Sequence, residues 1–80
     1  MKKRRGKPDI RERFGYALKM LREERHLTQE DLADKATIHR TYLSDIERGA
    51  RNVSLVNIER IALALGLSMG QLFHRVESNS

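Results

Sequence analysis

Polar and basic side chains gather between positions 39 and 52, and their spacing could form a recognition surface. Arg40, Thr41 and Ser44 fall on one face of a helix expected over about residues 40–48. An arginine can grip the O6 and N7 atoms of guanine with two hydrogen bonds, and a threonine can offer its hydroxyl and methyl groups to thymine. The chemistry available to this face is therefore hydrogen bonding to the edges of DNA bases.

The chain gives little support for catalytic or metal-binding chemistry. It has no cysteine, and His26, His39 and His74 do not have the spacing of metal ligands. No Ser/His/Asp arrangement in a helical or elbow context is visible, and the glycines do not form a phosphate-binding loop. We therefore expect no enzyme activity, no metal, no cofactor and no small-molecule ligand.

The net charge of +5 belongs to the start of the chain. Five of the sixteen Lys and Arg residues lie at positions 2–7, and the eleven others equal the Asp and Glu residues in number. We expect residues 1–8 to form a flexible basic arm, which could be a solvated end or could contact phosphates. An argument for nucleic-acid binding must therefore rest on the pattern of the other residues and not on the overall charge.

The length of 80 residues suits one domain. No apolar run approaches the roughly 20 residues that a membrane span needs. The basic start also lacks the apolar stretch of a secretory signal. We expect a cytoplasmic protein without membrane contact.

Apolar residues at helical spacing predict an all-α fold of five short helices around one core. The expected helices cover about residues 10–25, 29–36, 40–48, 55–65 and 69–74. Their expected capping residues are Asp9 with Glu12, Thr28 with Asp31, Ser54, and Ser68 with Gln71. His26, Gly49 and Gly66 stand where helices often end in a left-handed conformation. The domain should span residues 9–75, with residues 76–80 as a frayed tail.

Only three residues, 37–39, join the second and third predicted helices. Two short helices with such a turn form the bihelical unit that places its second helix in the DNA major groove. That groove is about 12 Å wide and accepts one helix. The second helix can bury Leu43 and Ile46 while its polar face stays outside. The pattern therefore favours a helix-turn-helix.

Several spaced positions agree at once with one family. The residues concerned are Leu27-Thr28-Gln29, Leu32-Ala33, Tyr42-Leu43, Ile46-Glu47, Gly49, Leu63-Ala64-Leu65 and Leu72-Phe73. On these residues the chain resembles the phage-repressor-like, or xenobiotic-response-element, helix-turn-helix family over about residues 10–73. The resemblance implies a five-helix, lambda-repressor-like DNA-binding domain. His26 in place of the usual Gly, and the basic arm, depart from the family pattern.

Within that family, residues 39–42 and the loop at residues 48–52 resemble the small controller proteins of restriction–modification systems, which are short standalone dimers. The resemblance implies autoregulation of an operon that carries restriction or methylation genes. It also implies that Arg22 pairs with Glu47 and thereby orients the third helix.

The motif and the resemblance together suggest DNA contacts. The expected base-reading residues are Arg40, Thr41, Ser44 and Arg51, and the expected phosphate contacts are Gln29, His39, Tyr42 and Asn52. Three alternatives stay open. The Tyr42 ring could instead pack against a neighbouring helix, and Asn52 could serve only turn geometry. Asp45 could accept a hydrogen bond from cytosine or could pair with Arg48.

We therefore expect a transcriptional regulator that binds double-stranded DNA as a homodimer, because one small reading helix buries too little surface to be both tight and specific. The expected interface residues, some of which should prove to be core, are Val56, Leu67, Met69, Leu72 and Phe73. The alternative is a protein-interaction module such as an antitoxin or adaptor. Polar residues at positions 40, 41, 44 and 51 argue against that alternative, because a protein partner would favour aromatic anchors there.

Overall fold

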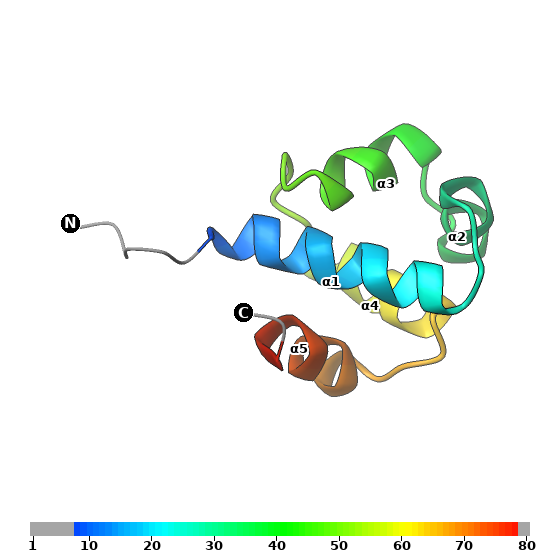
Figure 1. Cartoon of the computed structure of the whole chain (residues 1–80). Helices are drawn as coiled ribbons and strands as arrows, with labels where there is room; N and C mark the ends of the chain where they lie inside the picture. Colours follow the sequence, from blue (N-terminus) through cyan, green and yellow to red (C-terminus); the bar gives the residue numbers. More distant parts are fainter. Residues whose placement is uncertain (1–7, 79–80) are drawn as a thin grey trace.

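The computed structural model describes residues 8–78, and within them it contains five helices and no strand. The helices are α1 (Ile10–Glu24), α2 (Gln29–Ala36), α3 (Arg40–Glu47), α4 (Leu55–Ala64) and α5 (Met69–Ser78), shown in Figure 1. The predicted all-α class and the positions of all five helices are confirmed. Most of the expected basic arm, residues 1–7, lies outside the described residues, as do residues 79–80 of the expected tail.

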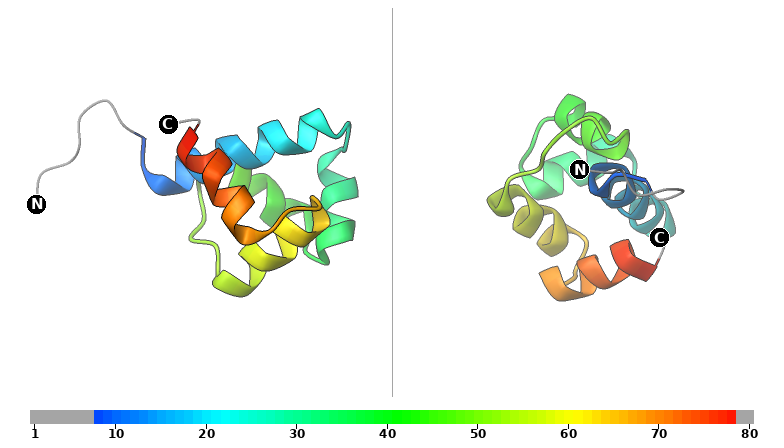
Figure 2. Two further views of the ribbon diagram at one scale, coloured as in Figure 1. Left: turned by 90° about the horizontal axis from the view of Figure 1, so that it is seen from below. Right: turned by 90° about the vertical axis from the view of Figure 1, so that its left-hand side faces the viewer.

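Helix α1 lies at the centre of the fold, since it packs against α3 on one side and α5 on the other. Helix α2 packs against α3 and α4, and α4 packs against α5, so that the helices enclose one core (Figures 1 and 2). The largest fully buried side chains come from all five helices: Leu18, Leu21, Leu32, Leu43, Ile46, Ile61, Leu72 and Val76. This arrangement leaves α3 at one edge of the molecule, with its inner face buried and its outer face free.

Local capping sets where the helices begin. Asp9 and Glu12 form a reciprocal capping box at α1, and Thr28 and Asp31 form another at α2. Ser54 accepts a hydrogen bond at 3.1 Å from the backbone N–H of Asn57 in α4. The same reciprocal bonds join Ser68 and Gln71 at the start of α5. Each expected cap is thus confirmed.

Four residues adopt the left-handed backbone conformation at turns between the helices. His26, Gly49 and Gly66 do so at the positions where the sequence predicts a helix stop, with φ of 56°, 78° and 76°. Thr37, at φ 60°, is a fourth case that the sequence did not reveal. A β-branched residue is unfavourable in this conformation, so Thr37 adopts a backbone conformation that its own side chain disfavours.

Gly15 allows the close approach of α1 to the end of α3. A Cβ atom built at this position would lie 2.3 Å from the carbonyl oxygen of Ile46 and 2.7 Å from that of Glu47. Any side chain would therefore push the two helices apart. Gly15 is a packing requirement that sequence periodicity does not reveal, because its partner lies about thirty residues away in the chain.

The end of the chain differs from the prediction. Residues 76–78 were expected to fray, but α5 continues to Ser78 and Val76 is fully buried. The reason is packing: Val76 extends the apolar stripe of Leu72 by one turn and contributes to the core. At the other end, Ile10 is 48% exposed although its spacing places it with the apolar face of α1.

Candidate nucleic-acid interface

The outer face of α3 carries the residues predicted to read bases. Arg40 and Thr41 are exposed in the first turn of the helix, and His39 precedes them as an exposed N-cap residue. The His39 side chain makes no capping hydrogen bond, unlike those of the residues that cap α1, α2 and α4. The first N–H groups of α3 therefore lack a side-chain partner at the N-cap position, where the helix dipole favours an anion.

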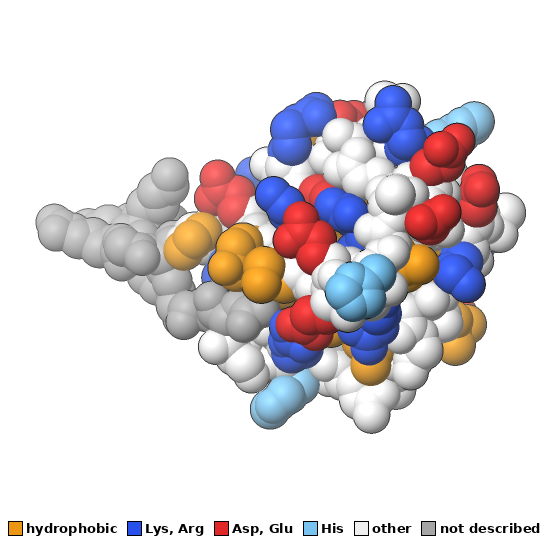
Figure 3. Space-filling model, turned by 45° about the vertical axis from the view of Figure 1, so that its right-hand side comes forward, with side chains coloured by type: hydrophobic (Ala, Val, Ile, Leu, Met, Phe, Trp, Pro, Cys, Tyr) orange, Lys and Arg blue, Asp and Glu red, His pale blue; other side chains and the backbone are white. Residues whose placement is uncertain are grey.

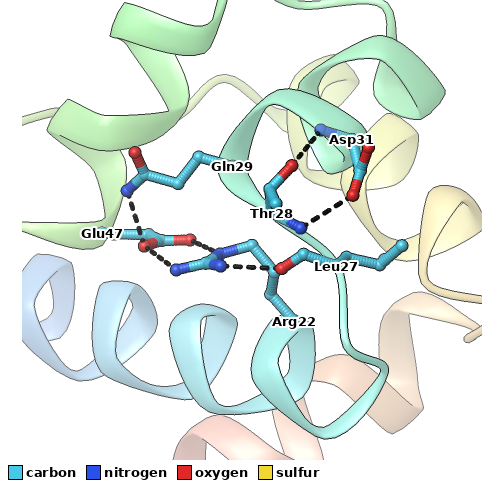
Figure 4. Close-up of polar contacts among 6 residues, drawn as sticks. All are labelled: Arg22, Leu27, Thr28, Gln29, Asp31 and Glu47. Carbon is cyan, nitrogen blue, oxygen red and sulfur yellow. Dashed lines mark hydrogen bonds and ion pairs between the residues drawn. The ribbon is translucent and has the colours of Figure 1, made fainter.

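A buried ion pair fixes the far end of α3. The guanidinium of Arg22 donates to both carboxylate oxygens of Glu47, at 2.6 and 3.0 Å, and to the carbonyl oxygen of Leu27 at 2.8 Å (Figure 4). The two side chains are only 10% and 5% exposed. The expected Arg22–Glu47 pair is present, and its hydrogen bond raises the pKa of Arg22. The contact joins α1, the loop before α2, and α3.

Gln29 extends this network to α2. Its side-chain amide donates to Glu47 at 3.0 Å, as Figure 4 shows. The sequence did not predict this bond, because it depends on how α2 approaches the end of α3. The amide oxygen and the backbone N–H of Gln29 still lie at the start of α2, beside a surface hollow of about 430 Å³ lined by Arg22, Thr28, Gln29, Glu30 and Arg40. Its phosphate role stays a prediction.

A second cluster of polar side chains lies at the C-terminal end of α3, with Asp45 at its centre. Arg48 donates to one oxygen of Asp45, and Arg51 donates to the other at 3.3 Å. Arg48 also donates to the hydroxyl of Ser44 at 3.1 Å. The pairing of Asp45 with Arg48, one of the two alternatives for Asp45, is thus present. Arg51 and Ser44 both lie in this cluster, and their base-reading role remains a prediction.

Tyr42 packs its ring inward and bonds α4 through its hydroxyl. The ring lies against the core cluster, and the guanidinium carbon of Arg51 sits 5.3 Å from the ring centroid. The Tyr42 hydroxyl accepts a hydrogen bond at 3.2 Å from the side-chain amide of Asn57 in α4. This agrees with the alternative in which the ring packs against neighbouring helices. The hydroxyl hydrogen can still be donated to a phosphate. Asn57 is a contributor that the sequence reading missed.

The expected dimer-interface residues divide into three groups. Leu72 is fully buried, so it is one of the candidates that belong to the core and not to an interface. Leu67, Met69 and Phe73 are partly buried against the core, and the Phe73 ring lies 5.9 Å from that of Phe14. Val56 is 60% exposed. The reading missed two further exposed apolar residues of α4, Leu55 and Leu63.

Charge is mixed on one face of the domain. Basic and acidic side chains are interspersed on the face drawn in Figure 3, without a uniform basic patch. Over residues 8–78 no cluster of three His, Cys, Asp or Glu side chains has metal-binding geometry. No helix in that range is long and apolar enough to span a bilayer.

Comparison with known proteins identifies the family. Residues 18–72 match the family model described as helix-turn-helix. The chain belongs to the helix-turn-helix family. Among its relatives is control protein C.MunI of Mycoplasma sp, which is 50% identical over 70 residues, 86% of this chain and 95% of that protein. The predicted resemblance to a helix-turn-helix family, which the sequence carries at positions 27–73, is thus confirmed.

Two solved structures are similar to this helix-turn-helix chain. The restriction–modification controller protein C.AhdI from Aeromonas hydrophila is 44% identical, with a TM-score of 0.77 over 79% of this chain and 96% of that one. The restriction–modification controller protein C.Esp1396I, solved as a tetramer in complex with its natural 35 base-pair operator, is 33% identical. Its TM-score is 0.83, over 91% of this chain and 96% of that one.

Proposed function

We propose that this protein is a transcriptional regulator that binds a specific double-stranded DNA sequence as a homodimer. The observation that carries the proposal is the placement of α3. The Arg22–Glu47 pair fixes one end of the helix to α1, while the other end presents Arg40 and Thr41 to solvent. A helix held in this way can enter the major groove with its first turn directed at base edges.

The relatives favour one biological setting. Controller proteins of restriction–modification systems recur among the similar proteins, and one of them was solved on its operator. On this basis we propose that the chain is the autoregulatory controller of such a system. It would act in the cytoplasm without catalytic activity.

We propose that the homodimer forms through α4. Val56 and Leu63 are seven residues apart on this helix, and they are 60% and 69% exposed. Residues at that spacing share one face, so α4 offers two exposed apolar side chains on the outside of the domain, with the exposed Glu59 and Arg60 between them. A two-fold dimer would present two copies of α3 to half-sites about one helical turn apart. Leu67 and Met69, which follow α4 in the chain, are partly buried against the core.

Selection of bound duplexes from a random DNA pool tests this function. The full chain should enrich a sequence with two-fold symmetry and half-sites about 10 base pairs apart. Enrichment of no sequence, together with stable capture of a protein partner through the α3 face, would instead favour the interaction-module alternative. A non-palindromic enriched sequence would keep the DNA-binding role but remove the symmetric homodimer.

A further inference from the structure

We propose that Asp45 is a positioning residue that sets the specificity of DNA binding, by holding Arg48 and Arg51 in place without contacting DNA itself. The inference rests on the DNA-binding function proposed above. Asp45 carries the same sign of charge as a phosphate. Its sequence position left two roles open, accepting a hydrogen bond from cytosine and pairing with Arg48.

Both carboxylate oxygens of Asp45 accept hydrogen bonds from arginines. One oxygen accepts from Arg48, and the other accepts from Nε of Arg51 and lies 3.3 Å from its NH2 group. The Asp45 side chain is only 18% exposed. A direct contact with cytosine would have to share an oxygen that already accepts from an arginine, on a side chain that is mostly covered. The geometry therefore favours a role through the arginines over direct reading of a base.

The two arginines remain available to a ligand while Asp45 holds them. Their side chains are 63% and 51% exposed, and a guanidinium has five N–H groups, most of which are free in these contacts. Arg51 is restrained from a second side by the ring of Tyr42, which is itself bonded to Asn57 of α4. Arg48 is restrained by the hydroxyl of Ser44. Both cations are thus presented in fixed positions at the junction of α3 and α4.

Asp45 also lies close to the reading residues. It follows Thr41 by four positions and so shares its face of α3. Its negative charge cancels one of the two arginine charges at the surface that would face DNA. With one of their two charges cancelled and their positions restrained, Arg48 and Arg51 can bind well only where phosphates and bases match those positions. Two free arginines could instead reach phosphates on any sequence.

The test compares the wild-type chain with Asp45→Asn, which removes the charge and keeps the side-chain shape. Binding is measured by fluorescence anisotropy at several salt concentrations, on the selected duplex and on a scrambled duplex of equal composition. Asp45→Asn should bind the scrambled duplex on the order of tenfold more tightly, with a salt slope steeper by about 1. Affinity for the selected duplex should change less, so that the ratio of the two affinities falls.

Glu77→Gln is the matched control. It makes the same change in net charge at an exposed position on α5, which lies on the other side of α1 from α3 (Figure 1). This variant should leave the affinity ratio unchanged. An equal fall in the ratio for both variants would overturn the proposal, because net charge alone would then explain the effect.

A second variant tests the arginine side of the same contact. Arg51→Gln should weaken binding to the selected duplex more than binding to the scrambled one. Equal weakening on both duplexes would overturn the proposal even if Asp45→Asn fails to fold, because Arg51 would then carry no specificity for Asp45 to set. Repeating the selection with Asp45→Asn should return the wild-type sequence with weaker enrichment. A changed base preference at one position would overturn the proposal in favour of direct reading by Asp45.

The outcomes separate this proposal from the function on which it rests. If the wild-type chain selects no sequence, the proposed DNA-binding function fails. If the wild-type chain selects a sequence and Asp45→Asn keeps the wild-type affinity ratio, only the role of Asp45 fails.

Discussion

At the scale of single residues, the contacts of Glu47 determine how α3 is presented. Its carboxylate receives hydrogen bonds from Arg22 of α1 and Gln29 of α2, at 2.6 to 3.0 Å. Family resemblance is enough to predict the pair with Arg22. The contact with Gln29 could not be predicted, because an amide at the start of a helix looks the same whether it faces solvent, a phosphate or a carboxylate.

Glu47→Ala should therefore lower the free energy of unfolding strongly. It leaves the buried guanidinium of Arg22 without its carboxylate, which costs about 3 kcal/mol in buried pairs. Urea unfolding measures the effect. The matched control is Glu24→Ala, which breaks the exposed Glu24–Arg75 pair at 2.6 Å and should cost less than about 1 kcal/mol. Similar losses for the two variants would refute the structural role of Glu47.

Asp31 makes stability depend on pH in the acid range. The backbone N–H of Thr28 donates to its carboxylate at 2.9 Å and lowers the pKa of Asp31 below its usual value near 3.8. A lowered pKa in the folded state stabilises the fold above the unfolded pKa, and this contribution is lost as the pH falls through the folded value. Stability should therefore decline below about pH 4.

Asp31→Asn tests this pH dependence, because the amide oxygen can still accept from Thr28 but cannot titrate. Urea unfolding between pH 2.5 and 6 should give a shallower decline for this variant than for the wild type. Asp34→Asn, which changes an exposed carboxylate outside the capping box of the same helix, should keep the wild-type profile. Identical profiles for all three proteins would contradict the assignment.

At the scale of helices, local sequence predicts where elements begin but not how closely they approach. The capping residues act through neighbours three positions away, so Asp9, Thr28 and Ser68 could be identified without a structure. Gly15 acts through a contact with α3, which only the fold creates. Val76 sits at helical spacing from Leu72, but the expectation that chain ends fray concealed its burial.

Gly15→Ala should destabilise the fold and disturb the packing of α3 against α1. The new methyl group would lie 2.3 Å from the carbonyl oxygen of Ile46, and overpacking of this kind costs about 1–3 kcal/mol. Gly70→Ala is the matched control in α5, where the nearest atom is 3.8 Å away. Because alanine is the better helix former but Gly70 lies in the first turn of α5, that variant should gain at most about 0.5 kcal/mol. Thermal unfolding measures the stability of both variants. A Gly15→Ala protein more stable than the wild type would contradict the close packing of α1 against α3.

Thr37→Gly should stabilise the turn between α2 and α3. Thr37 has φ of 60°, which glycine adopts without the steric cost of a β-branched side chain. We expect a gain of up to about 1 kcal/mol in urea unfolding, since the greater entropy of glycine in the unfolded chain offsets part of the relief. The same substitution at Thr28, where φ is −78° and the hydroxyl caps α2, should instead reduce stability. A loss at both positions would contradict the strain assigned to Thr37.

At the scale of the whole molecule, the proposed dimer depends on an apolar surface that the domain itself leaves uncovered. Periodicity predicted apolar residues on α4 and α5 but could not separate core from surface. Leu72 proved to be buried, whereas Leu63 is 69% exposed. Both residues have the same chemistry, and only the packing of α5 against α1 and α4 distinguishes them.

Leu63→Glu should convert the protein to a monomer, because it places a charge on the proposed two-fold interface. Sedimentation equilibrium should give the monomer mass, and affinity for the selected duplex should fall on the order of 100-fold through loss of the second half-site. Tyr16→Ser changes an exposed residue of α1 and should keep the dimer. A Leu63→Glu protein that still sediments as a dimer would exclude α4 as the interface.

If the first turn of α3 reads base edges, Arg40→Ala should change the ratio of affinities for specific and scrambled DNA. Binding is measured for wild type and variant on the selected duplex and on its scrambled counterpart at one salt concentration. The variant should lose about 1–3 kcal/mol of binding free energy on the selected duplex and much less on the scrambled one. An Arg40→Ala protein with the wild-type ratio of affinities would contradict base reading by this turn.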